Sequence, residues 1–124
     1  MVDIKKIKNI LNNMSEIEFA YLFGSYAKDS FCKQSDIDIA IYIKKEFNIF
    51  DTKLKVHHKL EIALNKKIDI VALNTVKNYN LLEDILSYNV ILKDSKNDER
   101  VMFELKKEHE ILDYKAFKRM LDVA

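Results

Sequence analysis

Two aspartates separated by a single residue, Asp36 and Asp38, lie inside an apolar stretch with the sequence SDIDIAIYI. On a β-strand both side chains would project from one face, while the intervening isoleucines would project from the other. The two carboxylates would then lie about 7 Å apart and repel each other by roughly 2 to 3 kcal/mol at an effective dielectric near 20. Because hard divalent cations prefer oxygen ligands, the pattern predicts a metal site. The plain alternative is an edge strand whose polar face meets water.

A glycine and a serine precede these aspartates. Gly24 is the only glycine of the 124-residue chain, which has no proline. It directly follows the run FAYLF, which predicts a buried strand, and we expect a short helix over residues 26–31. A strand that passes through such a turn into a helix can point backbone N–H groups at an anion. Gly24 and Ser25 are therefore expected to hold phosphate. Lys28 could add a contact, although a solvated helix lysine explains it equally well.

A third acid, Asp69, stands between Ile68 and Ile70 in the run KIDIVAL. This alternation of apolar and acidic residues matches that around Asp36 and Asp38, so it predicts a second strand with an acidic face. The alternative is an acid at a strand end that caps a turn.

The chain resembles the polymerase-beta-type nucleotidyltransferase superfamily through Gly24–Ser25, a gap of ten residues and the pair Asp36-x-Asp38. Within that superfamily, the short chain and the sequence motif GSYA…SDIDIAI are similar to those of the minimal nucleotidyltransferases, or MNT. The resemblance implies the family's mixed sheet with helices and a nucleoside triphosphate bound with magnesium. One position differs from the family's usual motif: Asp29 stands where a second glycine often follows the basic residue.

The same resemblance implies roles for the residues above. The Gly24–Ser25 pair would hold the phosphates of ATP, the substrate, and Asp36 and Asp38 would hold magnesium, with two ions expected. Asp69 matches the family's third carboxylate, which helps to hold metal and accepts the proton of the attacking hydroxyl. The implied reaction is transfer of a nucleoside monophosphate to a hydroxyl, with release of pyrophosphate.

Stand-alone enzymes of this kind resemble the antitoxin of HEPN/MNT toxin–antitoxin pairs, which adenylylates a tyrosine of a HEPN-domain ribonuclease toxin. The C-terminal segment 96–122 is similar to the tail of those antitoxins. Its apolar positions could dock a partner or simply cover the sheet: Phe103, Leu112, Tyr114 and Phe117. Two alternatives stay open. The protein could act on a small molecule such as an aminoglycoside, or it could be a non-catalytic module that neutralises a partner by contact.

Periodicity predicts one α/β domain over residues 1–124, with about four strands that alternate with helices. Helices are expected over 3–14, 48–65, 75–88 and 96–122, and strands over 18–23, 35–43, 67–73 and 90–93. In the helix 48–65 we expect Phe50, Leu54 and Ile62 to face inward. Three asparagines are expected to end helices in the left-handed conformation: Asn13, Asn65 and Asn89. The apolar period breaks near residue 109, which predicts a bend in the last helix.

Composition narrows the class further. The formal net charge is +1, so no global field attracts nucleic acid, which is not expected as a direct partner. A single cysteine, Cys32, suits a reducing compartment, and no segment reads as a signal peptide or a membrane span. We therefore expect a cytoplasmic protein without a membrane partner. The three histidines, His57, His58 and His109, lack metal-ligand spacing and are expected at the surface.

Overall fold

The computed structural model describes residues 3–28 and 36–123. Its four strands form one sheet in the order β3-β2-β1-β4. Strand β1 (Ile17–Phe23) is antiparallel to both β2 (Ile37–Ile43) and β4 (Val90–Lys93), whereas β3 (Ile68–Ala72) runs parallel to β2. The sheet is therefore mixed, and the expected fold class is confirmed.

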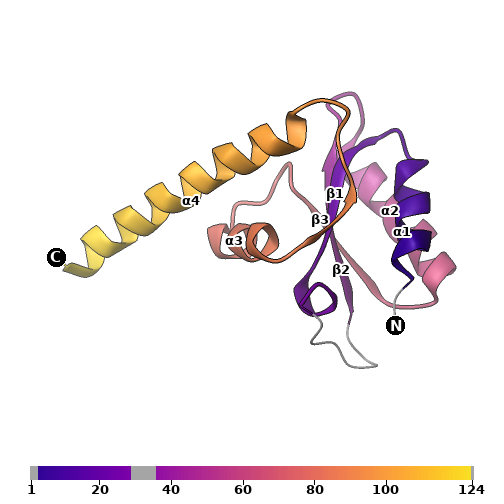
Figure 1. Ribbon diagram of the computed structural model, residues 1–124, viewed down its shortest axis with the longest axis horizontal. Helices are drawn as coiled ribbons and strands as arrows, with labels where there is room; N and C mark the ends of the chain where they lie inside the picture. Colours follow the sequence, from indigo (N-terminus) through magenta and orange to yellow (C-terminus); the bar gives the residue numbers. More distant parts are fainter. Residues whose placement is uncertain (1–2, 29–35, 124) are drawn as a thin grey trace.

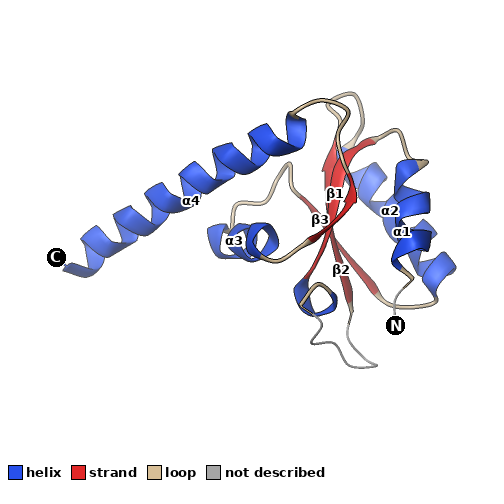
Figure 2. Cartoon of the chain, in the orientation of Figure 1, coloured by secondary structure: helices blue, strands red, loops and turns tan. Residues whose placement is uncertain are grey.

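Helices cover both faces of this sheet (Figure 1, Figure 2). Helices α1 (Ile4–Asn12) and α2 (Ile49–Leu64) lie against one face, and α3 (Tyr79–Ser87) and the first half of α4 (Glu99–Val123) lie against the other. A three-residue 3-10 helix, η1 (Gly24–Tyr26), follows β1. The short helix expected over 26–31 falls partly on residues 29–31, which lie outside the described residues.

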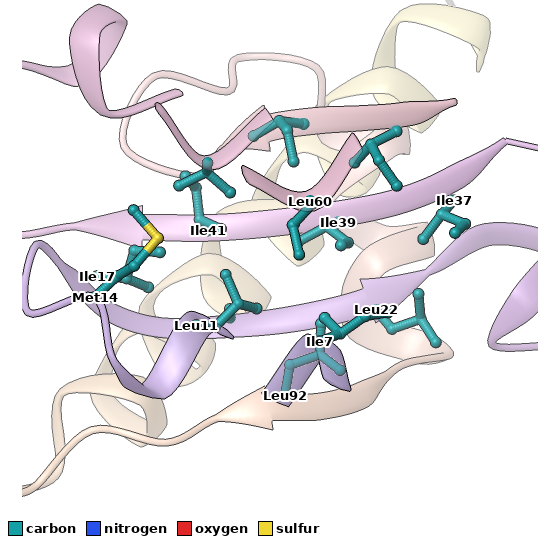
Figure 3. Packing of buried hydrophobic residues seen from close by; sticks show 14 of the residues in the cluster. Ile7, Leu11, Met14, Ile17, Leu22, Ile37, Ile39, Ile41, Leu60 and Leu92 are labelled. Carbon is teal, nitrogen blue, oxygen red and sulfur yellow. The ribbon is translucent and has the colours of Figure 1, made fainter. Parts of the chain in front are cut away.

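The larger core cluster lies between α1, α2 and the sheet. Ile37, Ile39 and Ile41 point into it from β2, and Ile7 and Leu11 point into it from α1 (Figure 3). All five side chains are fully buried. Burying a side chain of this size stabilises a fold by about 1.5 to 3 kcal/mol, so this isoleucine row fixes which face of β2 turns away from the core.

The second cluster lies between the sheet and the helices α3 and α4. Its aromatic part stacks Phe19 of β1 on Tyr42 of β2, with ring centroids 5.0 Å apart and planes within 6°. Phe103 of α4 closes the stack, with its ring 5.5 Å from that of Phe19. The aromatic stack therefore holds the start of α4 on the sheet.

Asparagine and aspartate side chains set several helix ends. Asp3 accepts a hydrogen bond from the Lys6 N–H at the start of α1, and Asn48 accepts one from the Asp51 N–H at the start of α2. Asn65 ends α2 in the left-handed conformation with φ 50°, as expected.

The same expectation is wrong for Asn13 and Asn89. Asn13 is right-handed, with φ −86°, because its N–H continues the helical pattern to the carbonyls of Asn9 and Leu11. Asn65 is the only non-glycine residue with positive φ in the described part of the chain. Helix α3 ends at Ser87, and the extended backbone of its cap residue, Tyr88, leads toward β4 without a left-handed reversal.

The inward face of α2 differs from the expectation. Phe50 and Ile62 are 68% and 69% exposed, and Leu54 is also exposed. Each of them lies two positions, or about 200° around the helix, from a residue that is buried. Those buried residues are Thr52, Val56 and Leu60. The helix carries two apolar stripes, and the sheet covers only one.

Helix α4 is a single α-helix of 25 residues, so the bend expected near residue 109 is absent. It begins at Glu99, after a turn in which the Ser95 hydroxyl accepts a hydrogen bond from the Arg100 N–H. Its far end extends beyond the sheet in Figure 1. No helix of the described chain is long and apolar enough to span a bilayer.

Candidate active site

The acids of the two parallel strands meet at one edge of the sheet. Asp38 of β2 is the register partner of Asp69 of β3, and Phe23, the last residue of β1, is its partner on the other side. Asp36 lies just before β2 on the same face. Because Ile37 and Ile39 fill the core on the opposite face, the strand must turn these aspartates toward the side of the sheet that α3 and α4 cover.

The electrostatics of this edge centre on Asp38. Burial and, after it, the negative charges of Asp69, Asp36 and Asp84 together raise the pKa of its carboxyl to about 6. Negative charge is therefore concentrated where the strands β2 and β3 meet.

Gly24 sits directly against Asp38. Its φ is +74°, a conformation that residues with a Cβ adopt at a cost. A Cβ at this position would overlap Asp38 Oδ2 and lie 3.1 Å from Asp38 Cγ. The Gly24 carbonyl accepts hydrogen bonds from the N–H groups of Ala27 and Lys28, both at 3.1 Å, which closes the turn. Glycine is thus required at residue 24 both by backbone conformation and by the space that the aspartate needs.

The structure gives Lys28 a partner that the sequence did not suggest. Its ammonium donates a hydrogen bond to Asp84 Oδ1 of α3 at 2.7 Å and lies 5.4 Å from the ring centroid of Tyr88. Residues 28 and 84 are far apart in the sequence, so no local sequence pattern could have predicted this pair. Asp84 and Tyr88 therefore join the candidate site through the packing of α3 alone.

The three sequence-predicted acids offer the oxygen donors that a magnesium ion takes. Asp36 Oδ2 lies 3.9 Å from Lys67 Nζ, so a cation of the chain partly offsets its charge. Among residues 3–28 and 36–123, no three histidine, cysteine, aspartate or glutamate side chains already form a group that could hold a metal ion. The donor chemistry fits the ion, and metal ligation by Asp36, Asp38 and Asp69 stays a prediction.

The remaining polar candidates lie away from this edge. His57 pairs with Glu61 along α2 at 3.2 Å, and His58 and His109 are exposed. Cys32 and Asp29 lie outside the described residues. The candidate site therefore consists of the acidic edge, the Gly24–Ser25 turn and the Lys28–Asp84 pair.

The sequence matches the profile of the family described as "Polymerase beta, Nucleotidyltransferase" over residues 5–99. A Methanocaldococcus jannaschii protein that bears a protein adenylyltransferase name is 30% identical over 76 residues, which are 60% of this chain and 76% of that protein. The protein adenylyltransferase MntA of Shewanella oneidensis is 32% identical over 71 residues, 57% of this chain and 50% of MntA. This chain thus matches half the length of MntA.

Solved structures share the fold. A toxin–antitoxin complex with AMP-PNP contains a chain with a TM-score of 0.79 and 24% identity, and the match covers 97% of this chain and 95% of that chain. A complex of a tri-AMPylated Shewanella oneidensis HEPN toxin with an MNT antitoxin gives a TM-score of 0.69 and 21% identity, over 96% of this chain and 95% of that chain. The match includes α4, which extends beyond the residues that the family profile covers.

Proposed function

The chain belongs to the polymerase beta nucleotidyltransferase family, and we propose that it transfers AMP from ATP to a tyrosine hydroxyl of a HEPN-domain toxin and thereby silences that toxin. One observation carries the chemistry: Asp38 lies between Asp69 and the Gly24 turn at one edge of the sheet. The relative MntA supports the reaction, and the fold shared with antitoxins bound to HEPN toxins supports the partner.

In the proposed reaction the tyrosine oxygen attacks the α-phosphorus of ATP. A bond forms between these two atoms, the bond from the α-phosphorus to the bridging oxygen breaks, and pyrophosphate leaves. Asp69 accepts the phenolic proton. Two magnesium ions, when bound, would lower the pKa of the acceptor hydroxyl and offset the phosphate charge. A phenol with a pKa near 10 is a more acidic acceptor than an aliphatic alcohol.

The other residues bind and orient the nucleotide. Gly24 lets the backbone approach the phosphates, and Ser25 offers a hydroxyl and an N–H group. Lys28, whose ammonium donates a hydrogen bond to Asp84, would leave that partner to reach the phosphates. Asp36, Asp38 and Asp69 would hold the metal ions. We also propose that the protein acts in the cytoplasm and that residues 1–124 form one domain.

The test combines the protein with ATP, Mg²⁺ and the product of the neighbouring gene, and measures the intact mass of that product. We expect one or more AMP additions, lost in an Asp36→Asn, Asp38→Asn double variant that keeps its circular dichroism spectrum. An unmodified partner together with an adenylylated aminoglycoside would replace this function with the small-molecule alternative. Silencing of the toxin by the double variant, without any transfer, would favour a module that acts by contact.

A further inference from the structure

Tyr88 carries a large aromatic ring that belongs to neither core cluster of the described residues. It directly follows α3 and is 60% exposed. The neighbouring Asn89 closes the helix end, because its side-chain amide donates hydrogen bonds to the carbonyls of Ile85 and Leu86 at 2.9 and 3.3 Å. The backbone at residue 88 is thus held by contacts that do not involve the ring, so the fold leaves the ring available for another role.

The strand register brings this ring to the Gly24 turn. In the antiparallel pair of β1 and β4, Leu22 is the register partner of Val90. The residues two positions beyond this pair are Gly24 and Tyr88, so both leave the sheet at the same edge. Lys28 belongs to the same corner, since its N–H donates a hydrogen bond to the Gly24 carbonyl at 3.1 Å.

Two side chains at the end of α3 hold the Lys28 ammonium at this corner. Asp84 Oδ1 accepts a hydrogen bond from it at 2.7 Å, and the centroid of the Tyr88 ring lies 5.4 Å from the same nitrogen. The two contacts differ in kind, because the carboxylate offsets the positive charge whereas the ring attracts a cation through its quadrupole and carries no net charge. A phosphate that takes the ammonium must therefore displace Asp84, but it does not compete with the ring.

A lysine that no other group holds is a costly phosphate ligand. Its four-carbon stem populates many rotamers, and fixing them when a ligand binds costs free energy. A ring that already holds the ammonium beside the Gly24 turn removes part of this cost before the nucleotide arrives. The corner also belongs to the same site as the acids, because the charge of Asp84 contributes to the raised pKa of Asp38.

We propose that Tyr88 is a positioning residue for Lys28, and that its ring keeps the ammonium at the terminal phosphates of ATP once the ion pair with Asp84 has opened. The ring then favours nucleotides with a long phosphate chain, because AMP, which ends at the α-phosphate, does not reach the ammonium. Asp84 and Tyr88 act in opposite senses on one cation. This inference rests on the proposed function and adds to it a residue that no motif of the sequence indicated.

The first experiment measures the dissociation constants of ATP and of AMP, each with Mg²⁺, by calorimetry. Tyr88→Leu removes the ring but keeps an apolar side chain, and we expect it to weaken ATP binding by about two- to fivefold, the range for an exposed cation–π contact. AMP binding should not change. Tyr88→Phe, which keeps the ring, should retain the affinity of the wild type for ATP. In a Lys28→Met background, Tyr88→Leu should have no further effect.

Phe50→Leu is the matched control, since it removes an exposed ring from α2, and it should leave ATP binding unchanged. An unchanged dissociation constant in Tyr88→Leu would overturn the proposal. A loss that persists in the Lys28→Met background, or that is equal for AMP, would overturn it too, because the ring would then contact the nucleotide itself. An equal loss in Tyr88→Phe would assign the effect to the hydroxyl and exclude the ring. If the wild-type chain does not bind ATP, the proposed function itself fails.

The second experiment observes the ring contact by NMR and needs no activity. Protons of a lysine stem that lie over an aromatic ring resonate upfield because of the ring current. We expect such a shift for the Lys28 Hε signals, which Lys28→Met assigns, and we expect it to vanish in Tyr88→Leu and to persist in Tyr88→Phe. The shift should survive saturation with ATP and Mg²⁺. A wild-type spectrum without the shift, or loss of the shift when ATP binds, would overturn the role of the ring.

Discussion

Asp38 occupies the most crowded position of the site, because it has acids beside it and a backbone turn pressed against it. The contact with Gly24 makes a specific prediction. Gly24→Ala should lower the free energy of unfolding by about 1 to 3 kcal/mol, because the new Cβ needs a positive φ and the space of the Asp38 carboxylate. Part of this loss should disappear in an Asp38→Ala background and none in an Asp69→Ala background. Chemical denaturation of the four proteins measures the coupling, and equal losses in all backgrounds would contradict the contact.

The raised pKa of Asp38 predicts how pH acts on the metal-free protein. Between the ordinary value of 3.8 and about 6, the folded chain binds more protons at this carboxyl than the unfolded chain does. The free energy of unfolding should therefore fall as pH rises through this window, by about 1 to 2 kcal/mol given partial solvation. Asp38→Asn should remove that fall and be more stable than the wild type at pH 7. Denaturation in chelator across this range checks the difference, and parallel pH profiles would show that Asp38 is not responsible.

The pairing of Lys28 with Asp84 predicts an effect on nucleotide affinity. Asp84→Asn removes the partner that holds the ammonium and one negative charge near the phosphates. We expect the dissociation constant for ATP to fall by about two- to fivefold, the range for an exposed ion pair. Calorimetry measures it, with Asp113→Asn on α4 as the control of equal charge. Weaker binding by Asp84→Asn would mean that the aspartate positions Lys28 for phosphate instead of competing with it.

At the scale of elements, α4 has two parts with different roles. Phe103 packs on Phe19 and Tyr42, whereas Leu112 and Phe117 are 63% and 60% exposed. Phe103→Ala should therefore cost about 2 to 4 kcal/mol of stability. Phe117→Glu should leave the melting temperature unchanged and weaken the complex with the partner. Pull-down of the partner and thermal melts separate the two effects, and an unaffected complex would show that the partner docks elsewhere.

The sequence was most informative where spacing along one strand decides orientation. The alternation around Asp36 and Asp38 correctly predicted that the isoleucines fill the core and that the acids turn the other way. Spacing failed for α2, because Phe50 and Ile62 are as apolar as Val56 and Leu60, and only the position of the sheet selects between the stripes. Residue spacing also could not predict the role of Asp84, because only tertiary packing brings this residue to Lys28.

At the scale of the molecule, a polar network joins α4 to the sheet. The Arg100 guanidinium donates to Asp94 Oδ1 at 2.8 Å and to Glu104 Oε2 at 2.9 Å, and Glu104 accepts a hydrogen bond from the Tyr21 hydroxyl of β1 at 3.0 Å. These contacts and the aromatic stack fasten the first third of the helix, and the packing of Ile111 and Tyr114 and the ion pair of Lys115 with Glu83 hold its middle. A ligand bound at the acidic edge of the sheet should therefore raise the free energy of unfolding of the chain, whether or not the last turns of α4 are folded.

A bound metal–nucleotide complex should stabilise the folded chain by mass action. At a concentration of ATP and Mg²⁺ about a hundredfold above the dissociation constant, the gain is about 2.7 kcal/mol, or a rise in melting temperature of roughly 8 °C. ATP in chelator should give a much smaller rise, since the acids then repel the phosphates. The Asp36→Asn, Asp38→Asn double variant serves as the control. An equal rise in that variant would place the nucleotide away from the acidic edge.

The uncovered end of α4 has a consequence for the lifetime of the free chain. Lys118 and Arg119 are exposed on the last turns of α4, beyond Lys115, which pairs with Glu83 of α3, and such helix ends open locally at little cost in free energy. They are the bonds that a trypsin-like protease would reach first. A partner seated on Leu112 and Phe117 would shield the same bonds. Degradation of the free chain and assembly of the complex would then compete for one helix end.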